Sequence, residues 1–352
     1  MLIDNVSKRD IRALDLEALR VFFESHNQQA FRADQVYQWL WQKGAHSFEV
    51  MTNLSKATRE LLDTSFVINH IAVDRQQRSA DKTIKNAIRL HDGLTIESVL
   101  IPTETRSTAC VSSQVGCSLD CTFCATSQLK RMRNLNPDEI YDQVMALDSQ
   151  SRLYFDRPLS NIVFMGMGEP LMNYKNVITA VDKITAGLGM SPKRITISTS
   201  GIPKMIEKLA DENPKFQLAV SLHSAREDVR NSIMPFSTSF ELPILLKSLQ
   251  YWYLKTQSKV TFEYLIWKGI NDAQIDIDAL VAYAKKVPSK VNIIEYNPID
   301  AGDFRAADKE VIERYKQALE RAKITVTVRR SRGKDIDAAC GQLANKLVPL
   351  EH

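Results

Sequence analysis

The sequence contains no apolar run of the roughly 20 residues that a membrane-spanning helix requires. Its first residues carry charges where a secretory signal peptide would have its apolar region. Glycine and proline contribute only 12 residues each to a chain of 352, too few for a linker-rich or low-complexity protein. These absences predict a globular protein of the cytoplasm that has no membrane partner.

A large excess of one charge is also missing, since 46 Lys and Arg face 42 Asp and Glu and leave a net charge of +4. This mild excess is compatible with nucleic-acid binding but is no evidence for it. Apolar residues make up 44% of the chain, so a protein of this length can bury a sizeable core. We expect a helical domain at 1–70, linking strands at 71–102, a main domain at 103–335 and a C-terminal segment at 336–352.

The first 70 residues have a helical pattern. Apolar residues recur at helical spacing between residues 14 and 22, and a second helix is expected at 32–42. A third helix follows Ser55, a residue type that caps helix N-termini. From residue 70 to 102, apolar and polar residues alternate, which predicts paired strands.

Beyond these paired strands the pattern changes to alternating strands and helices. The expected strands are 162–166, 195–199, 217–222, 260–266, 291–296 and 324–328. The expected helices are 137–149, 174–187, 203–213, 242–254, 275–286 and 307–321. Such alternation indicates an α/β fold with a parallel sheet, either open or curled into a barrel. Polar residues that follow these strands are candidate ligand contacts, because ligands bind at the carboxyl ends of parallel strands.

The five cysteines are an odd number, which argues against a disulfide framework in a reducing compartment. Three of them, Cys117, Cys121 and Cys124, form a C-x3-C-x2-C triplet. Thiolates at this spacing can hold one face of an iron–sulfur cube and leave one iron open to a substrate. The alternative is a structural zinc site that a distant Cys or His completes. The spacing of the triplet favours an iron–sulfur cluster but does not exclude a zinc site.

The triplet, with an aromatic residue before its last cysteine, resembles the signature of radical S-adenosylmethionine (SAM) enzymes. Further blocks resemble the adenine-C2 RNA methyltransferases of the RlmN type: VSSQVGCSLDCTFCAT, FMGMGEP (164–170), ISTSG (197–201), SLH (221–223), YNP (296–298) and DIDAACGQLA (335–344). The blocks span roughly residues 97–344. The resemblance implies a partial (β/α) barrel as the radical SAM core, with a small N-terminal helical domain.

The same resemblance implies two cofactors, a [4Fe–4S] cluster and SAM. Cys117, Cys121 and Cys124 would be the cluster ligands, and the open iron would chelate the amino and carboxylate groups of SAM. Gly168 and Glu169 would hold the SAM amino group, because a glycine allows close backbone approach and a carboxylate pairs with an ammonium. The other residues of the SAM pocket would be Ser198, Ser221, Leu222, His223 and Asn297.

Three further residues acquire catalytic roles from the resemblance. Cys340 would receive a methyl group from a first SAM, and a radical from a second SAM would convert this methyl into a radical that adds to adenine C2. Cys110 would resolve the adduct through a transient disulfide with Cys340. Glu97 would accept the C2 proton. The radical route has a physical reason, because C2 is electron-poor and offers no nucleophile to the electrophilic methyl of SAM.

The implied substrates are adenine 2503 of 23S rRNA and adenine 37 of tRNA, and the base must be flipped or lie in a loop to expose C2. A flavodoxin-type electron donor and a monomer are also expected. The segment 321–334 holds six Lys and Arg and no acid, so it is either a solvated charge run or a phosphate-contacting edge beside Cys340.

Two other functions remain as alternatives. The related C8-adenine methyltransferase of the Cfr type shares the cluster and both reactive cysteines, but the GMGEP block with Pro170 favours C2. A zinc-containing RNA-binding protein without catalysis is the alternative from another class. A radical SAM enzyme for a small molecule would not explain a late cysteine beside a basic segment.

Overall fold

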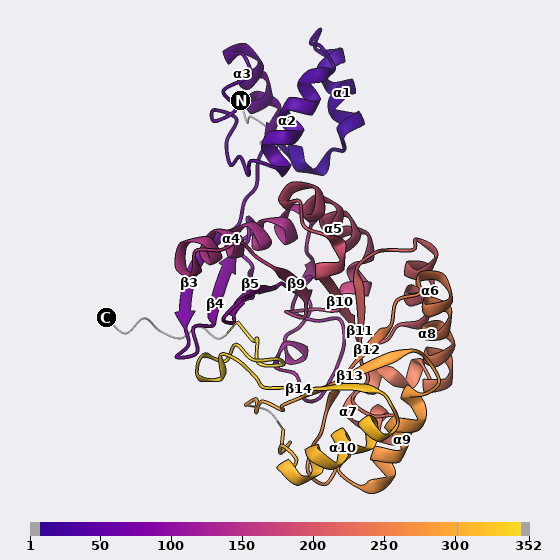
Figure 1. Cartoon of the computed structure of the whole chain (residues 1–352). Coiled ribbons are helices and arrows are strands. Elements are labelled where there is room, and N and C mark those ends of the chain that lie inside the picture. The colour runs from indigo at the N-terminus through magenta and orange to yellow at the C-terminus, as the bar shows by residue number, and fades with distance from the viewer. Residues whose placement is uncertain (1–7, 301, 346–352) are drawn as a thin grey trace.

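A computed structural model describes residues 8–300 and 302–345 of the chain (Figure 1). The expected domain ends at 1–7 and 346–352 lie outside the described residues. The N-terminal elements are β1 (Arg9–Asp10), α1 (Leu16–Ser25), α2 (Phe31–Trp41), α3 (Lys56–Ser65) and β2 (Phe66–Val67). The three helices confirm the helical pattern of this region. Ser55 caps α3, since its side chain accepts a hydrogen bond from the backbone N–H of Thr58.

One ten-stranded sheet organises the rest of the chain, in the spatial order β14-β13-β12-β11-β10-β9-β6-β5-β4-β3. Its strands are β3 (Ala72–Arg78), β4 (Ile84–Arg89), β5 (Thr95–Pro102), β6 (Ser107–Cys110), β9 (Asn161–Phe164), β10 (Ile195–Thr199), β11 (Gln217–Ser221), β12 (Val260–Leu265), β13 (Ser289–Ile294) and β14 (Thr325–Arg329). From β6 to β14 all neighbours are parallel, whereas β3 to β6 pair antiparallel. This mixed sheet confirms the α/β class.

Helices cover the outer face of the sheet (Figure 1). They are α4 (Pro137–Phe155), α5 (Tyr174–Leu188), α6 (Pro203–Asp211), α7 (Glu227–Ile233), α8 (Leu242–Thr256), α9 (Gln274–Ala284) and α10 (Lys309–Arg321). Their apolar stripes face the sheet, as in α5, where Val177, Ala180, Val181 and Ile184 are buried. The helices expected from the sequence are present, whereas α7 was not expected.

Short elements connect these parts. They are the two-residue strands β7 (Gln114–Val115) and β8 (Arg133–Asn134) and the 3-10 helices η1 (Ile11–Ala13), η2 (Ala125–Gln128), η3 (Pro170–Asn173), η4 (Pro192–Arg194), η5 (Pro235–Ser239) and η6 (Lys334–Ile336). The strands β7 and β8 pair with each other at the two ends of the loop that holds the cysteine triplet. None of the helices in the described ranges is both long and apolar enough to cross a bilayer.

The N-terminal helices rest on α4 and α5 through a buried polar junction. The Arg12 guanidinium lies 2.8 Å from Asp142 and 3.3 Å from Asp138, both on α4. The hydroxyl of Tyr141 donates to the backbone carbonyl of Trp41 at 2.5 Å. Removing one partner would leave a buried charge uncompensated, so this junction fixes how the N-terminal helices sit on the core.

Candidate active site

The cysteine triplet lies on the loop between β7 and η2, on the carboxyl side of β6, the first of the parallel strands. Gly116 opens the loop with φ = +77°, and a Cβ there would lie 2.6 Å from the carbonyl oxygen of Lys130. Only glycine fits this close approach without strain. Cys117, Cys121 and Cys124 line one cavity, which we call the cysteine cavity.

The thiols of the cysteine cavity suit a positively charged multi-iron group. Burial raises the pKa of Cys117 to about 12 and also raises that of Cys121, so their thiolates need a compensating positive charge. Within residues 8–300 and 302–345, no three His, Cys, Asp or Glu side chains converge on a point where one metal ion could bind. Three thiols in one cavity are the type of ligand that a [4Fe–4S] cube needs.

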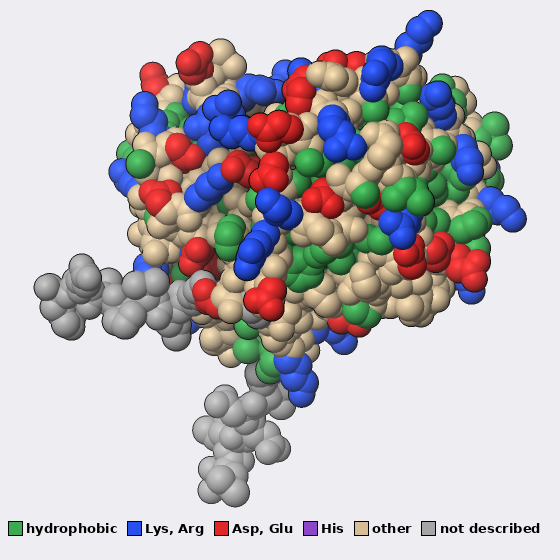
Figure 2. Space-filling model, turned by 90° about the horizontal axis from the view of Figure 1, so that it is seen from below, with side chains coloured by type: hydrophobic (Ala, Val, Ile, Leu, Met, Phe, Trp, Pro, Cys, Tyr) green, Lys and Arg blue, Asp and Glu red, His purple; other side chains and the backbone are tan. Residues whose placement is uncertain are grey.

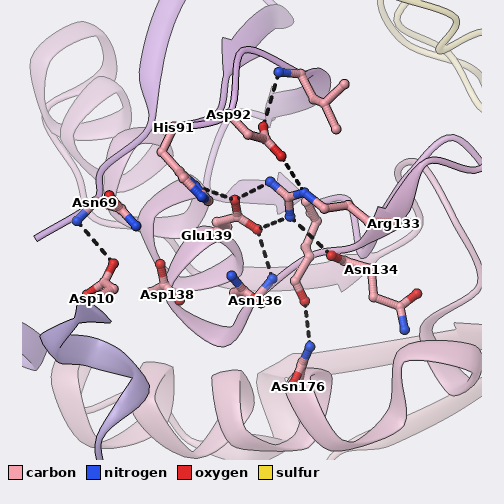
Figure 3. A network of polar contacts seen from close by, with 12 residues as sticks. Asp10, Asn69, His91, Asp92, Arg133, Asn134, Asn136, Asp138, Glu139 and Asn176 are labelled. Atoms are coloured by element: carbon pink, nitrogen blue, oxygen red, sulfur yellow. Dashed lines mark hydrogen bonds and ion pairs between the residues drawn. The ribbon is translucent and has the colours of Figure 1, made fainter. Parts of the chain in front are cut away.

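A polar network fixes the exit of the cysteine loop (Figure 3). Arg133 on β8 makes two hydrogen bonds of 2.7 Å to the Glu139 carboxylate at the start of α4, and another of 2.6 Å to Asp92. Asp92 belongs to the turn between β4 and β5. Glu139 also accepts the backbone N–H of Asn136 at 2.8 Å, which closes the helix cap. Three separate segments therefore hold the end of the loop.

Gly168 and Glu169 lie in the same cavity wall as the cysteines. Gly168 has φ = +95°, and a Cβ there would lie 2.5 Å from Cβ of Gln114. The Glu169 carboxylate is buried and accepts the backbone N–H groups of Leu171 at 3.0 Å and Ser200 at 2.8 Å. Burial raises its pKa, although these hydrogen bonds oppose the shift. A cationic partner such as an ammonium would therefore stabilise this carboxylate.

Ser198, Ser221 and His223 also line the cysteine cavity. His223 adopts φ = +55°, and its Nδ1 accepts the backbone N–H of Leu265 at 3.2 Å. Burial lowers the pKa of His223 to about 3, so the ring is neutral at physiological pH. Leu222 is different: its side chain is fully buried in the main apolar core and does not line the cavity. The structure therefore offers only its backbone to a ligand.

Asn297 has a buried acceptor that no protein group satisfies. Its Nδ2 donates to the carbonyl oxygens of Glu295 at 3.2 Å and Cys340 at 3.3 Å. Its Oδ1 has no hydrogen-bond partner among the described residues. An unpaired buried acceptor is costly, so a donor supplied by a bound ligand fits this position. Asn297 thus joins the candidate SAM site to the backbone of Cys340.

Cys340 lies where two cavities meet. It lines the cysteine cavity and also a second cavity, which we call the arginine cavity, whose walls include Cys110, Arg329, Arg330 and Arg332. Both cysteines are free thiols; Cys340 is exposed, whereas Cys110 on β6 is buried. Burial raises the pKa of Cys110 to about 12, and the nearby Cys340 sulfur adds to the shift. The fold thus brings two cysteines far apart in sequence to one cavity.

Like the Leu222 side chain and Asn297, Glu97 is a predicted site residue that lies outside both cavities. It is buried on β5, and its Oε2 accepts the backbone N–H groups of Ala344 at 2.9 Å and Asn345 at 3.2 Å. Its Oε1 lies 3.4 Å from the Lys85 ammonium. The carboxylate thus contacts the chain just after Cys340, while its proposed role in proton transfer stays a prediction.

Glu263 is a charged cavity residue that the sequence analysis missed. Glu263 on β12 is buried and lines the cysteine cavity, where it accepts a hydrogen bond of 2.9 Å from Asn292 and lies 3.6 Å from Arg329. Burial raises its pKa, and the Arg329 charge opposes the shift. The sequence does contain a signal for this residue, because Glu263 is the acidic residue of a mostly apolar strand.

Comparisons with known proteins agree with this geometry. Residues 9–68 match the model of the ribosomal RNA large subunit methyltransferase N-terminal domain, and residues 111–282 match that of the radical SAM superfamily. A probable dual-specificity RNA methyltransferase RlmN from Flavobacterium psychrophilum is 68% identical over 97% of this chain and 99% of its own. The Desulfosudis oleivorans enzyme of that name is 42% identical over 96% of this chain and 91% of its own.

A solved structure is similar along nearly the whole chain. The radical SAM methyltransferase from Sphaerobacter thermophilus is 36% identical, covers 95% of this chain and 99% of its own, and has a TM-score of 0.89. Radical SAM enzymes use a [4Fe–4S] cluster and SAM, the groups that the cysteine cavity fits. With these relatives spanning the helical region, the sheet and the cysteine cavity alike, the chain belongs to the RlmN family of dual-specificity RNA methyltransferases.

Proposed function

We propose that this protein methylates C2 of adenine in RNA, at adenine 2503 of 23S rRNA and adenine 37 of tRNA, with Cys340 as the carrier of the methyl group. The observation that carries the proposal is the position of Cys340 between the cysteine cavity and the arginine cavity. A methyl group on its sulfur could be activated from one side and meet a base from the other.

The proposed cofactor-binding residues, most of which line the cysteine cavity, divide into three groups by role. Cys117, Cys121 and Cys124 hold the cluster, while Glu169 pairs with the SAM ammonium beside Gly168. Ser198, Ser221, the Leu222 backbone, His223 and Asn297 complete the SAM pocket. When bound, cluster and SAM together supply a 5′-deoxyadenosyl radical.

The two lone cysteines then perform the transfer. Cys340 loses its thiol proton and takes a methyl group as a thioether; loss of one hydrogen atom from this methyl leaves a carbon radical that adds to adenine C2. Glu97 accepts the C2 proton, and the adduct radical would give one electron back to the oxidised cluster. Cys110 attacks the Cys340 sulfur, so that the carbon–sulfur bond breaks, the methylene carbon takes up a proton, and a Cys110–Cys340 disulfide forms. Their shared cavity supports this pairing.

Local arginines rather than overall charge support RNA as the substrate. Lysine and arginine side chains are interspersed with aspartate and glutamate on the face shown in Figure 2. Neither sign of charge dominates that face. Arg329, Arg330 and Arg332 nevertheless line the arginine cavity beside Cys340. Guanidinium groups bind phosphate well, so these residues would hold the backbone next to the reacting base. We further propose a cytoplasmic monomer that receives electrons from a flavodoxin-type donor.

The test is methylation of two purified RNAs, a 23S rRNA fragment and a tRNA, by the protein with reconstituted cluster. Matched transcripts with guanine at the target position serve as controls. Mass spectrometry should find 2-methyladenosine at both targets and none in the controls. A product of 8-methyladenosine would replace the C2 proposal by the Cfr-type reaction, and absence of methylation on both RNAs would contradict the proposed substrates.

A further inference from the structure

The segment that carries Cys340, residues 333–345, contacts the antiparallel strands β3 to β5 as well as the chain after β13 (Figure 1). We call it the Cys340 segment. Its contacts with β3 to β5 come from residues that no step of the proposed function uses, apart from Glu97.

The first contact is made by the turn between β3 and β4. The Asp81 carboxylate accepts the backbone N–H of Gly333 at 3.0 Å. In return, the Asp335 carboxylate accepts the Ser79 hydroxyl at 2.5 Å and the backbone N–H of Ala80 at 3.1 Å. Hydrogen bonding by Ser79 lowers the pKa of Asp335, so the charged form is favoured at neutral pH. The turn therefore fixes the start of the segment.

A buried ion pair makes the second contact and touches both sides of Cys340. The Lys85 ammonium lies 3.4 Å from Oε1 of Glu97 and donates to the backbone carbonyl of Asp337 at 3.5 Å, before Cys340. Oε2 of Glu97 accepts the N–H groups of Ala344 and Asn345, after Cys340. Both charged side chains are almost completely buried. Such a pair adds little net stability but makes loss of one partner costly, so it specifies a conformation.

The middle of the segment is fastened to the cysteine loop instead. The backbone N–H of Ala125 donates to the carbonyl of Gly341 at 2.7 Å, and the Thr126 hydroxyl donates to that of Leu343, also at 2.7 Å. The ends are thus held by β3 to β5, and the centre is held next to the candidate cluster ligands. Cys340 lies between these two sets of contacts.

We propose that Lys85 and Asp81 are positioning residues, and that strands β3 to β5 form a frame that places Cys340 between the two cavities. The inference rests on the proposed function of Cys340 as methyl carrier. Lys85 sets the backbone on both sides of Cys340, directly through Asp337 and indirectly through Glu97. Misplacing a reacting group by about 1 Å can lower a rate on the order of 100-fold, so a frame of this kind controls the transfer step.

Lys85→Met tests the frame, with Lys85→Arg as the conservative variant. Lys82→Met is the matched control, because Lys82 is an exposed residue of the same hairpin. In the cluster-loaded protein, we expect Lys85→Met to cleave SAM within about twofold of the unaltered protein while RNA methylation falls by about tenfold or more through kcat. Lys85→Arg should recover part of this loss, and Lys82→Met should methylate normally.

Hydrogen exchange gives a readout that does not depend on activity. The amides of Ala344 and Asn345 should exchange at least about tenfold faster in Lys85→Met than in Lys82→Met, because Glu97 loses its partner. Unchanged exchange together with full methylation in Lys85→Met would overturn the frame. If Lys85→Met does not fold, Asp81→Asn takes its place, with faster exchange expected at Gly333 and unchanged exchange contradicting the proposal. If the unaltered protein methylates no RNA, the proposed function fails, while the exchange result still tests the frame.

Discussion

The parallel strands β9 to β13 and the antiparallel strands β3 to β5 belong to one sheet but position the site in different ways. β12 is buried along its whole length, and the parallel strands present cavity residues at their carboxyl ends, as Ser221 on β11 does. β3 is largely exposed, and side chains of β4 and β5 hold a distant backbone segment. One half of the sheet holds the proposed cofactor-binding residues directly; the other half contacts the chain that carries Cys340.

This difference predicts that damage in the two regions has different consequences. Changes around the cysteine cavity should remove cofactor chemistry and leave the fold intact. Changes in β3 to β5 should leave cofactor chemistry intact and disturb transfer to RNA. The tests below run from the largest expected effect to the smallest.

Cys121→Ala should remove activity altogether. Two thiolates cannot hold the cube securely, so iron loading and methyl transfer should be lost, while the apolar strands keep the sheet folded. Iron and sulfide analysis, with circular dichroism as the measure of folding, checks both parts. A Cys121→Ala protein that still cleaved SAM reductively would refute the assignment of the triplet.

Glu97→Gln should distinguish the proposed role of Glu97 as proton acceptor from its contacts with the Cys340 segment. SAM cleavage should persist, but release of methylated RNA should slow by about tenfold or more, because the proton acceptor is gone. Glutamine keeps an acceptor oxygen for Ala344 and Asn345, but the buried Lys85 ammonium loses its ion pair, so these amides should exchange faster than in the unaltered protein and slower than in Lys85→Met. If methylated RNA is released at the normal rate, Glu97 has no role in proton transfer and only positions the Cys340 segment.

Replacing Arg329 and Arg330 by glutamine should weaken RNA binding about tenfold at moderate salt. Fewer counterions are then released, so the slope of log K against log salt should become shallower by about one for each phosphate that the protein no longer neutralises. Filter binding across a salt series measures both quantities. If the slope does not change, Arg329 does not contact RNA phosphates, and its role is limited to the ion pair with Glu263.

His223 should give a smaller effect, which is measured as the pH dependence of stability in the cluster-free protein. Its folded pKa of about 3 lies below the unfolded value, so the unfolded chain binds the proton first and stability falls as pH drops below about 6.5. From pH 7 to pH 5 the cluster-free protein should lose about 2 kcal/mol through this group. His223→Gln should lack this part of the decrease in urea titrations, whereas His26→Gln at an exposed helix end should keep it.

Local pattern was enough to predict the parallel part of the sheet. The strand expected at 195–199 coincides with β10, and the one at 260–266 exceeds β12 by one residue. α7 was missed because only three of its seven residues are buried, too few for a helical pattern. The SLH block of the family resemblance placed Leu222 in the expected SAM pocket, although its side chain belongs to the apolar core.

The alternation at 70–102 predicted paired strands, which β3 to β5 confirm, but the contacts of these strands with the Cys340 segment could not be predicted in this way. Lys85 contacts Asp337 across 252 residues, and neither residue stands out in its local sequence. The triplet is recognisable because its ligands are close in sequence, whereas the frame depends on pairings that only the folded chain creates. Glu97 was found through the family resemblance, which supplied a catalytic role but not its contacts with the Cys340 segment.

The most direct test is to compare Cys110→Ala with Cys340→Ala in the presence of RNA, cluster and SAM. Cys110→Ala keeps the methyl carrier, so RNA should become attached to Cys340 and accumulate as a slowly migrating band on a denaturing gel. Cys340→Ala and the double variant should form no such band, because the carrier is absent. Normal turnover of Cys110→Ala without trapped RNA, or a covalent RNA adduct in Cys340→Ala, would contradict a methyl group carried by Cys340 and released by Cys110.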